Sequence, residues 1–594
     1  MSGASAGPAA FLGVERSLTG RRWLSRLGDE RQALALSQRL GLPEMIGRVL
    51  AARGIGLDEA ESFLNPTLRD LLPDPGHLRD MDKAVARLVA AVTAGETIGI
   101  FGDYDVDGAT SSALLKNFLD AAGGRSRVYI PDRITEGYGP NAPALLRLKA
   151  EGIGVVVTVD CGTTAFEALA AAQAAGLDMV VVDHHVGEAA LPPALAVINP
   201  NRLDEDSPHG HLAAVGVAFL LAVALNRGLK LAGWYDGRGA PDLMRWLDLV
   251  ALGTVCDVVP LIGVNRALVT QGLKVMGLRR NIGLAALVDV AGVKERPDAY
   301  HLGYVLGPRV NAGGRVGEAD LGTRLLSTDD TSEAGNIARR LDGYNKDRQE
   351  IEAAVLQQAI EQVEGRPDDG LPLLLAAGEG WHQGVIGIVA GRLKERYGRA
   401  ACVVALAGGE GKGSGRSVAG LDLGAAIIAA RQAGLLRAGG GHAMAAGFTV
   451  ARDRLGELHA FLGERLQSQL DGDLVPLLEL DGALDAGAAS VELVESLAQI
   501  GPFGSGNPEP RFAIAAARIV RADVVGSGHV RLMLAGAGGK RLKAIAFRAA
   551  DSEMGHALLS SQGTAFHLAG ALRADTWQGS TSVQLVIDDA AFSR

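Results

Sequence analysis

Short apolar runs alternate with helical patterns through residues 96–200, and this alternation restricts the fold more than any other feature of the chain. The apolar runs TIGIFG, SRVYIP, VVVTVD and MVVVDHH are separated by stretches such as SSALLKNFLDAAG and APALLRLKAEG. Strands that alternate with helices in this way form a parallel sheet with crossover helices. Ligands of such sheets bind beyond the carboxyl ends of the strands. We therefore predict an α/β domain with its functional site at that edge.

Two further patterns follow this domain. A smaller α/β block begins at PLLLAAGEG and closes around GGGHAMAAGFTV, and one long helix over residues 326–364, with a cap region at Ser327 and Thr328, is expected to connect the two blocks. From about Pro476 onward, short strands such as RFAIAAARIV, HVRLMLAG and KRLKAIAFR predict a small β-barrel. The predicted organisation is an N-terminal helical extension (1–75), a parallel-sheet domain (76–325), the connecting helix (326–366), the smaller α/β domain (367–470) and the barrel (471–594).

Length and composition agree with several folded domains. The chain has 594 residues, of which 48% are hydrophobic and 21% charged, so it is too long for one hydrophobic core and too apolar for disorder. Its first residues contain no apolar stretch long enough for a signal peptide, and no run approaches a membrane span. The cysteines Cys161, Cys256 and Cys402 are widely separated, which fits reduced thiols. We expect a cytoplasmic protein without a membrane partner, and the composition favours a monomer.

The distribution of charge bears on whether the chain binds a polyanion. The net charge of −10 argues against such a partner, because phosphate binding depends on Lys and Arg. However, the stretch from Arg511 to Arg548 holds eight basic residues against one acid, Asp523. We therefore expect a local basic surface on the predicted barrel.

Three carboxylates follow the first predicted strand. Asp103, Asp105 and Asp107 stand at a spacing of two residues, and Gly108 comes directly after them. At the end of a strand these side chains could converge on a cation. The alternative is an Asx-rich turn that caps the following helix, and the motif alone leaves the two interpretations equally open.

Other strand ends favour the metal interpretation. Asp160 ends the third strand, Asp183, His184 and His185 end the fourth, and Asp257 follows the apolar run LDLVALGTVC. Several acids at one sheet edge would repel one another unless a cation lay between them. Oxygen ligands with few imidazoles and no thiolate favour Mn²⁺ or Mg²⁺ over zinc or copper. Two ions that share a carboxylate could activate water and stabilise the leaving oxygen of a phosphodiester.

The same motifs carry a family resemblance. DYDVDG, VDCG, VDHH and GTVCDVVPL, in this order, resemble the leading motifs of the DHH phosphoesterases, and in particular those of the RecJ exonucleases. The resemblance extends over nearly the whole chain, through RGIGLDEAESFLNP, RITEGYGPN, GPRVNAGGR, GWHQGVIGIVAGRL, GKGSGRS, GGGHAMAAG and GPFGSGNPEPRF. It implies a DHH domain, a DHH-associated domain and an OB-fold that binds single strands without sequence preference. It further implies a single-stranded-DNA-specific 5′-to-3′ exonuclease that releases mononucleotides with two metal ions in DNA repair and recombination.

The resemblance also assigns roles to the acids and histidines. It implies that Asp107, Asp160 and His185 take part in catalysis, with Asp160 bridging two ions and His185 contacting the scissile phosphate or assisting proton transfer. The alternative for His185 is that it only orients a neighbouring residue. Many relatives have a His four residues before the first metal-binding Asp, where this chain has Phe101, and Asp103 is expected to compensate. The implied metal ligands are Asp103, Asp105, Asp107, Asp160, His184 and Asp257.

Several further motifs are expected to bind the substrate. Arginine forks suit phosphate, and glycines let backbone N–H groups approach it, as in GPRVNAGGR. An aromatic side chain such as Tyr138 can stack on a base without regard to sequence. The alternatives are a turn with surface arginines, a packed Tyr138, and a structural role for His442 beside a glycine turn. The implied substrate residues are Arg133, Tyr138, Asn141, Arg309, Asn311, Arg315, Arg416, Ser417, Gly440, Gly441 and His442.

Three functions are compatible with these motifs. The first is the exonuclease, with single-stranded DNA as substrate and, by family resemblance, single-strand binding protein and a recombination helicase as protein partners. The second is a DHH-family phosphodiesterase for short oligonucleotides or cyclic dinucleotides, or a manganese pyrophosphatase, although those relatives usually lack the basic barrel and the long N-terminal extension. The third is a non-enzymatic replication scaffold on a decayed DHH domain. Loss of metal ligands would indicate the scaffold, and the ligands are present here.

Overall fold

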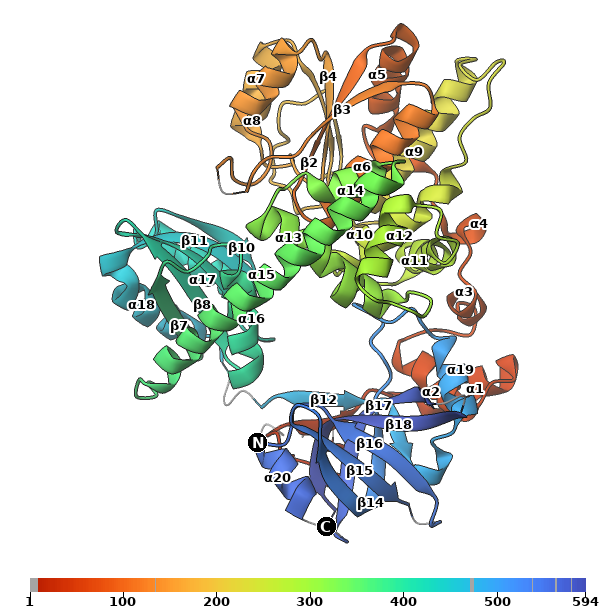
Figure 1. Ribbon diagram of the computed structural model, residues 1–594, viewed down its shortest axis with the longest axis vertical. Coiled ribbons are helices and arrows are strands. Elements are labelled where there is room, and N and C mark those ends of the chain that lie inside the picture. Colours follow the sequence, from red (N-terminus) through yellow and green to blue (C-terminus); the bar gives the residue numbers. More distant parts are fainter. Residues whose placement is uncertain are drawn as a thin grey trace, which may run out of the picture. The chain divides into compact units, whose positions relative to one another are not determined.

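The chain folds into two compact units in the computed structural model, which describes residues 9–133, 135–470, 475–536, 538–560, 563–577 and 580–593. The first unit combines Met1–Leu72, Pro260–Thr270 and Val475–Arg594. The second unit combines Pro73–Val259 and Gln271–Leu474. The two ends of the sequence therefore belong to one unit, whereas the predicted organisation kept the N-terminal extension separate from the barrel (Figure 1).

The second unit contains the predicted parallel sheet. Its strands run in the spatial order β3-β2-β4-β5-β6, and all pairings are parallel. α7 and α8 cover one face, and α5, α6 and α9 cover the other (Figure 1). This arrangement confirms the predicted α/β fold class and explains the continuous apolar runs, because such strands are buried on both faces. The elements are β2 (Thr97–Gly102), β3 (Arg125–Tyr129), β4 (Val155–Val159), β5 (Asp178–Val182), β6 (Ala196–Ile198), α5 (Met81–Ala94), α6 (Val106–Ala121), α7 (Ala142–Ala150), α8 (Phe166–Ala174) and α9 (Ala214–Leu231).

Helix α9 is the one helix among the described residues that is long and apolar enough to cross a membrane. Of the apolar stretch Ala214–Leu231, 67% is buried inside the protein. Its side chains pack against α5, α6 and α10 (Leu247–Cys256). A helix that is apolar all round is typical of a protein core as well as of a membrane, and burial accounts for the composition of α9.

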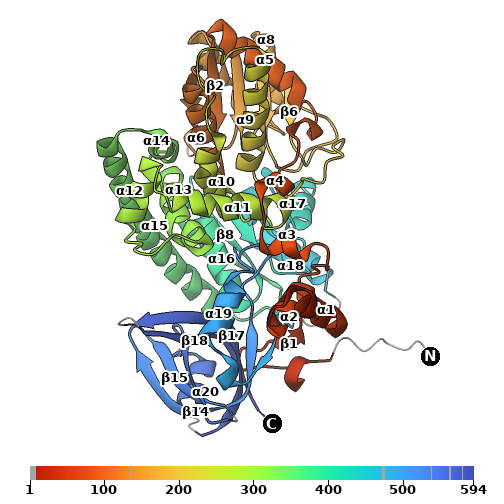
Figure 2. The ribbon, with the colours of Figure 1, turned by 90° about the vertical axis from the view of Figure 1, so that its right-hand side faces the viewer.

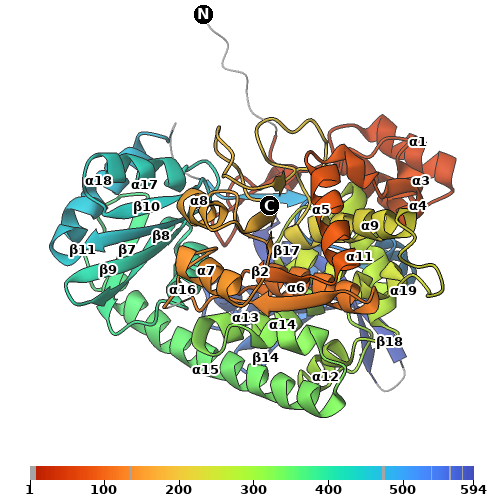
Figure 3. The same cartoon turned by 90° about the horizontal axis from the view of Figure 1, so that it is seen from above.

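A group of helices follows the sheet and ends in a helix that spans the unit. α15 (Thr331–Glu364) runs from α12 (Ile282–Val290) to α16 (Ile386–Tyr397), as Figure 3 shows from above. The prediction of one helix from residue 326 is wrong about where this helix begins. α14 (Leu321–Ser327) ends where that helix was expected to begin, because Thr328 is extended, and Asp330 caps α15 by accepting from the N–H groups of Ser332 and Glu333. The remaining helices of this group are the π-helical turn η4 (His301–Leu306) and α13 (Gly307–Val316). α11 (Gly263–Met276) belongs to the first unit up to Thr270 and to the second unit from Gln271.

The predicted smaller α/β block is a mixed sheet with helices on both faces. Its strands run in the order β10-β11-β9-β8-β7, with β7 and β8 parallel and the other pairs antiparallel. α15 and α16 pack on one face, and α17 and α18 pack on the other. The elements are β7 (Leu373–Glu379), β8 (Ala400–Ala407), β9 (Glu410–Arg416), β10 (Ala438–His442), β11 (Ala445–Ala451), α17 (Leu423–Gln432) and α18 (Leu455–Gln467).

The first unit is built around the predicted barrel, which is confirmed. Its strands run in the order β13-β14-β15-β16-β18-β17, and an additional pairing of β14 with β17 closes the barrel (Figure 2). Buried residues alternate with exposed ones along β15 and β16, as in a sheet with one face toward the core. The elements are β13 (Gly482–Leu484), β14 (Phe512–Val525), β15 (His529–Ala535), β16 (Arg541–Ala546), β17 (Ala565–Trp577), β18 (Ser580–Phe592), α19 (Val491–Ala498) and α20 (Glu553–Ser560).

The N-terminal segment completes this unit. β1 (Arg22–Ser25) pairs in parallel with β12 (Leu477–Leu480), so the extension is not wholly helical. Trp23 is fully buried, and its indole N–H donates to Asp589 Oδ2 over 2.8 Å. The helices α1 (Glu30–Leu40) and α2 (Glu44–Ala52) share one apolar core with the barrel strands, and the short helices α3 (Ala60–Leu64) and α4 (Leu68–Leu71) follow.

Candidate metal centre and nucleic-acid site

The DYDVDG motif turns from β2 into α6. Asp105 is the N-cap of α6, and its Oδ1 accepts hydrogen bonds from the backbone N–H groups of Asp107 at 2.9 Å and Gly108 at 3.1 Å. A Cβ at Gly108 would lie 2.4 Å from the carbonyl oxygen of Asp103, so the turn requires glycine. The helix-cap interpretation of the motif therefore holds for Asp105. The cap does not exclude a metal, because both capping hydrogen bonds go to Oδ1 and the second oxygen of Asp105 can still coordinate an ion.

Asp107 lies in the first turn of α6 and is fully buried. Its two oxygens accept from the backbone N–H groups of Ala214 at 2.7 Å and Val215 at 2.9 Å, at the start of α9. Ala213, the N-cap of α9, has no side-chain acceptor of its own, so Asp107 satisfies these donors from another helix. Burial, together with the charge of Asp105, raises the pKa of Asp107 to about 7. A nearby cation would reverse this effect and keep the carboxylate ionised.

Asp160 follows β4 in a strained conformation. Its φ of 61° lies in the left-handed region, which costs a residue other than glycine about 1–3 kcal/mol. The backbone holds it there, because its N–H donates to the Val182 carbonyl at 3.0 Å and its carbonyl accepts from the Tyr138 hydroxyl at 3.1 Å. Burial and the charges of the neighbouring aspartates raise the pKa of Asp160 well above its usual value.

The DHH triplet follows β5, and its first residue is structural. Asp183 Oδ1 accepts from the backbone N–H groups of His184 and His185 and lies 2.7 Å from His185 Nδ1, while Oδ2 accepts from Thr163 N at 3.0 Å. Burial alone would raise the pKa of Asp183, but the hydrogen bond and charge of His185 hold it below its ordinary value. Burial opposes ionisation of His185 as well, and Asp183 outweighs it and raises the pKa of His185 to about 9.

Two asparagines after β6 support the same loop. Asn199 Nδ2 donates to the His185 carbonyl at 2.8 Å, and Asn201 Nδ2 donates to the His184 carbonyl at 2.6 Å. No role was predicted from the sequence for the two asparagines, and Asp183 was predicted only as one of the acids at the sheet edge. The signal available was their position, since INPN follows another strand that ends at the same edge of the sheet.

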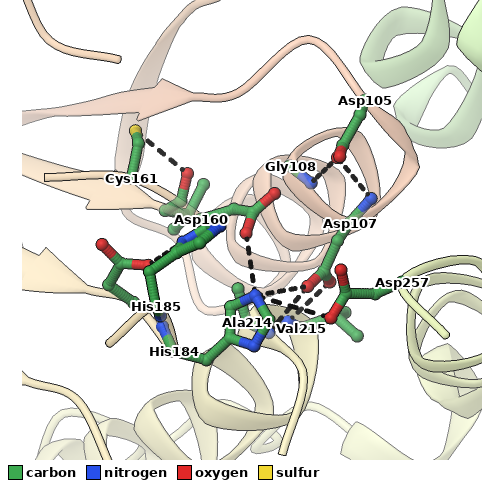
Figure 4. A network of polar contacts seen from close by, with 12 residues as sticks. Asp105, Asp107, Gly108, Asp160, Cys161, His184, His185, Ala214, Val215 and Asp257 are labelled. Atoms are coloured by element: carbon green, nitrogen blue, oxygen red, sulfur yellow. Dashed lines mark hydrogen bonds and ion pairs between the residues drawn. The ribbon is translucent and has the colours of Figure 1, made fainter. Parts of the chain in front are cut away.

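Asp107, Asp160, His184 and Asp257, which are predicted ligands, converge at this edge (Figure 4). His184 Nε2 lies 3.4 Å from Asp160 Oδ1, 3.5 Å from Asp257 Oδ2 and 4.0 Å from Asp107 Oδ2. Burial raises the pKa of Asp257 to about 9 and lowers that of His184 to about 4. The groups of side chains that could hold an ion are Asp103, Asp105 and Asp160; Asp107, His184 and Asp257; and Asp160, His184 and His185.

The donor set fits a hard divalent cation. Asp103 Oδ1, Asp160 Oδ1, His184 Nε2 and Asp257 Oδ2 are buried and make no hydrogen bond in the described structure. Buried ionisable groups without partners are costly unless they coordinate a metal. Carboxylate oxygens with one imidazole are ligands that suit Mn²⁺ or Mg²⁺. Phe101 takes no part, because it is fully buried toward α7 and α8 and stacks on Tyr129 at 5.3 Å. That Asp103 compensates for it stays a prediction.

The RITEGYGPN loop lies beside this centre, apart from Ile134, which is outside the described residues. The Arg133 guanidinium lies 5.1 Å from the ring centre of Tyr104, which belongs to the DYDVDG motif. Tyr138 is 53% exposed, and its ring meets that of His185 edge to face at 6.1 Å. Asn141 instead caps α7, since its Oδ1 accepts from Ala144 N at 2.9 Å.

The GPRVNAGGR segment is helix α13, so the expectation of glycines that free backbone N–H groups for phosphate is wrong. The glycines serve packing, because a Cβ at Gly314 would lie 2.6 Å from the Tyr104 carbonyl. Arg309 is held in an ion pair with Asp342 at 2.9 Å, and Asn311 is partly buried on the same helix. Arg315 donates to the Gly384 carbonyl at 3.0 Å and is directed toward the smaller sheet.

Arg315 meets Arg416 at a pocket of about 250 Å³, whose lining residues are Arg315, Gly387, Ile388, Gly391, Arg392, Glu395 and Arg416. Burial, and then the charge of Arg133, lowers the pKa of Arg315 to about 10, and the same two causes lower that of Arg416. Three arginines therefore repel one another here, which predicts an anionic ligand.

The other predicted residues of the smaller sheet lie differently. Ser417 is buried, and its hydroxyl donates to the Leu421 carbonyl at 2.8 Å, which is a structural role. Gly440, Gly441 and His442 lie on the edge strand β10, where His442 is exposed. Gly441 has a φ of 151°, and a Cβ there would lie 2.4 Å from the Ala445 carbonyl, so β10 and β11 approach closely at this glycine.

Comparison with known families agrees with this architecture. Residues 97–254 match the DHH family, N-terminal domain; residues 370–468 match the DHHA1 domain; and residues 480–589 match the RecJ OB domain. The parallel sheet, its edge of carboxylates and the adjoining smaller sheet thus define a DHH phosphoesterase.

Similar curated proteins show to which family of DHH phosphoesterases the chain belongs. The chain is 39% identical over 565 residues to the single-stranded-DNA-specific exonuclease RecJ of Dickeya dadantii, and 37% identical over 563 residues to that of Escherichia coli; each match spans 92% of this chain and 96% of the relative. The chain belongs to the RecJ family of single-stranded-DNA-specific exonucleases. A crystal structure of Thermus thermophilus RecJ in complex with Mn²⁺ resembles it with a TM-score of 0.79 at 29% identity, covering 96% of this chain and 78% of that one.

Proposed function

We propose that the chain removes mononucleotides from the 5′ end of single-stranded DNA in a reaction that requires Mn²⁺ or Mg²⁺. The 5′-to-3′ direction of this reaction is proposed from one observation, the cluster of Arg133, Arg315 and Arg416 beside the carboxylates. A 5′ end of cellular DNA carries a terminal phosphate, whereas a 3′ end carries a hydroxyl. Partly buried arginines that repel one another therefore favour a 5′ end, whose phosphate would neutralise them and fix the first phosphodiester over the metal centre.

The metal centre would hold two ions. Asp160 and His184 each belong to two of the groups that could bind an ion. Of these two side chains only the carboxylate of Asp160 has two oxygens with which to contact both ions, which supports it as the shared ligand. Ions bound there would activate water and neutralise charge that develops on the scissile phosphate. The remaining ligands in this proposal are Asp103, Asp105, Asp107, His184 and Asp257.

His185 would act from the rim of this centre. Its side chain is 49% exposed and is held by Asp183, so one face of the imidazole is open toward a substrate. Asp183 raises the pKa of His185, which favours the protonated imidazole. A cationic imidazole can donate a hydrogen bond to the scissile phosphate or a proton to the leaving oxygen. Tyr138, beside it, has an exposed ring that can stack on a base.

The barrel offers a second surface for the strand. Arg518, Arg521, Arg531, Arg541 and Lys543 lie on the exposed face of three neighbouring strands, while the alternate residues face the core. Asp523 pairs with Arg521 and Arg531 and leaves the surface basic. Such a surface suits the backbone of single-stranded DNA without sequence preference.

The proposal includes a cellular context that rests on the family. The chain would act in DNA repair and recombination in the cytoplasm, as a monomer, with single-strand binding protein and a recombination helicase as partners. The relatives in Dickeya dadantii and Escherichia coli are named single-stranded-DNA-specific exonucleases, which supports a role at exposed single strands.

The test is digestion of an oligonucleotide labelled at either end, with Mn²⁺ present. Mononucleotides released from the 5′ label, with a duplex spared, are expected. Asp160→Ala should reduce turnover below detection and leave strand binding measurable, while Asp347→Asn, at an exposed position of α15, should change neither. Release from the 3′ label would overturn the polarity. Hydrolysis of dinucleotides alone, with long strands inert, would favour the small-substrate phosphodiesterases of the superfamily.

A further inference from the structure

Two tyrosines form an exposed stacked pair on the second unit. Tyr300 is 54% exposed and Tyr304 is 74% exposed, and their ring centres lie 5.1 Å apart with an interplanar angle of 29°. Large aromatic side chains are usually at least half buried, so a stacked pair with open faces marks a binding surface. Neither the metal centre nor the arginine cluster uses these residues.

The pair is mounted rigidly. Tyr304 lies within the π-helical turn η4, and Tyr300 immediately precedes it; π-helical turns are rare and occur frequently at functional sites. The opposite face of η4 packs on the end of α10, where Cys256 Sγ donates to the Leu302 carbonyl at 3.4 Å. A Cβ at Gly307 would lie 2.5 Å from Cys256 Sγ, so the two helices are in close contact. The next residue after Cys256 is Asp257, a predicted metal ligand.

The same helix connects the pair with the arginine cluster. η4 continues directly into α13, which carries Arg315, so Tyr304 precedes Arg315 on one continuous run of helix. At about 1.5 Å per residue the separation along this run is roughly 17 Å. The pair is therefore too far from the arginines to contact the terminal nucleotide, and close enough to contact bases further along the same strand.

The charges around the pair permit a polyanion. His301, next to Tyr300, engages both nearby acids, with Nδ1 2.7 Å from Asp298 and Nε2 3.0 Å from Glu295. Lys294 and Arg296, in the same loop, are exposed. The two tyrosine rings form a flat, uncharged surface that is open to solvent. The nucleobases are the part of single-stranded DNA that can stack on such a surface.

We infer that Tyr300 and Tyr304 form a stacking platform for bases of the single strand, several nucleotides from the end that is being hydrolysed. The inference rests on the proposed function, because it takes the arginine cluster as the position of the strand end. The platform would hold the strand between successive cleavages without reading its sequence, and it would matter only for strands long enough to reach it.

The inference is tested by comparing the effect of the tyrosines on a long strand with their effect on a dinucleotide. With the full chain and Mn²⁺, the Tyr300→Ala/Tyr304→Ala variant should raise KM for a long oligothymidylate roughly tenfold, which corresponds to the loss of one stacked base, and leave kcat unchanged. KM and kcat for a 5′-phosphorylated dinucleotide should not change. Tyr300→Phe/Tyr304→Phe should restore the KM of the wild type, because phenylalanine keeps the ring. Leu231→Ala, which removes a 90% exposed side chain at the end of α9, is the matched control.

A fluorescent base analogue locates the contact directly. 2-Aminopurine at successive positions of the strand should be quenched at an internal position in the wild type and not in the alanine variant. Equal KM values for wild type and alanine variant on the long strand would overturn the platform, and so would an equal loss on the dinucleotide. A wild-type protein that leaves the 5′-labelled strand intact would instead overturn the proposed function, so the two failures are distinguishable.

Discussion

Asp183→Asn tests how the DHH loop is held. The carboxylate of Asp183 accepts on one oxygen from the backbone of His184 and His185 and on the other from the backbone of Thr163. Asparagine keeps a single acceptor oxygen and presents an NH₂ group where the second oxygen was. One buried N–H group therefore loses its partner, and His185 loses the charge that stabilises its protonated form.

The expected cost is about 2–4 kcal/mol of local stability. An unsatisfied buried N–H group contributes about 1–3 kcal/mol. A pKa of His185 raised from 6.5 to about 9 would correspond to roughly 3 kcal/mol if the group were fully shielded. Because the side chain is 49% exposed, solvent screening reduces this contribution to about 1 kcal/mol.

The two contributions differ in their dependence on pH. The pKa of His185 is raised in the folded state, so its contribution is fully present below the unfolded value of 6.5 and is lost as the pH rises through about 9. The pKa of Asp183 is lowered, so its contribution is present above the unfolded value of 3.8 and is lost as the pH falls below that value. The ion pair therefore stabilises the loop most between about pH 4 and 6.5, whereas the hydrogen bond to Thr163 acts throughout.

Hydrogen exchange of the backbone amides of β5 and the following loop, in the full chain without divalent metal, measures this local free energy of opening. The difference between wild type and Asp183→Asn should be about 2–4 kcal/mol near pH 6 and about 1 kcal/mol smaller near pH 10. No difference near pH 6 would refute the structural role of Asp183. A difference that is the same at both pH values would refute the contribution of the ion pair.

Three further predictions follow from single contacts. Arg416→Lys keeps the charge but loses the planar fork, so the preference for 5′-phosphorylated over 5′-hydroxyl strands should fall about tenfold in a competition digest. Gly108→Ala places a Cβ 2.4 Å from the Asp103 carbonyl, so the affinity for Mn²⁺ should fall by about tenfold or more in calorimetric titration. Trp23→Phe removes the buried hydrogen bond to Asp589, so urea unfolding of the first unit should lose about 1–3 kcal/mol.

The first two of these predictions have a matched control variant. Arg437→Lys, at an exposed arginine of the smaller sheet that pairs with Glu410, should leave the preference for a 5′-phosphate unchanged. Gly343→Ala, where a Cβ meets nothing within 4 Å, should leave the Mn²⁺ affinity at the wild-type value. A wild-type Mn²⁺ affinity for Gly108→Ala would contradict the tight turn. Wild-type stability of Trp23→Phe would show that the Asp589 contact contributes nothing.

The sequence predicted the positions of the acids because they depend on a short-range pattern. Strands that alternate with helices form a parallel sheet, and the carboxyl ends of these strands lie at one edge. The sequence therefore predicted that Asp105, Asp160 and His184 lie close together. The fold class and the barrel are confirmed for the same reason, since local periodicity determines both.

What the sequence did not predict depends on distant partners. Asp107 caps a helix that begins 107 residues later in the chain, and no local pattern indicates such a contact. Arg309 was expected at the substrate and instead pairs with Asp342 on another helix. The helical conformation of GPRVNAGGR was missed because its glycines suggested a turn, whereas they allow α13 to approach Tyr104.

The contact of Trp23 in β1 with Asp589 in β18 has a consequence for biosynthesis. Trp23 is synthesised 566 residues before its partner Asp589. At about 5–20 residues per second, the N-terminal strand and helices wait roughly half a minute to two minutes for the barrel they complete. The parallel sheet is finished during that interval. During this interval the newly made chain carries α1 and α2 without the barrel strands that bury their apolar side chains in the finished protein.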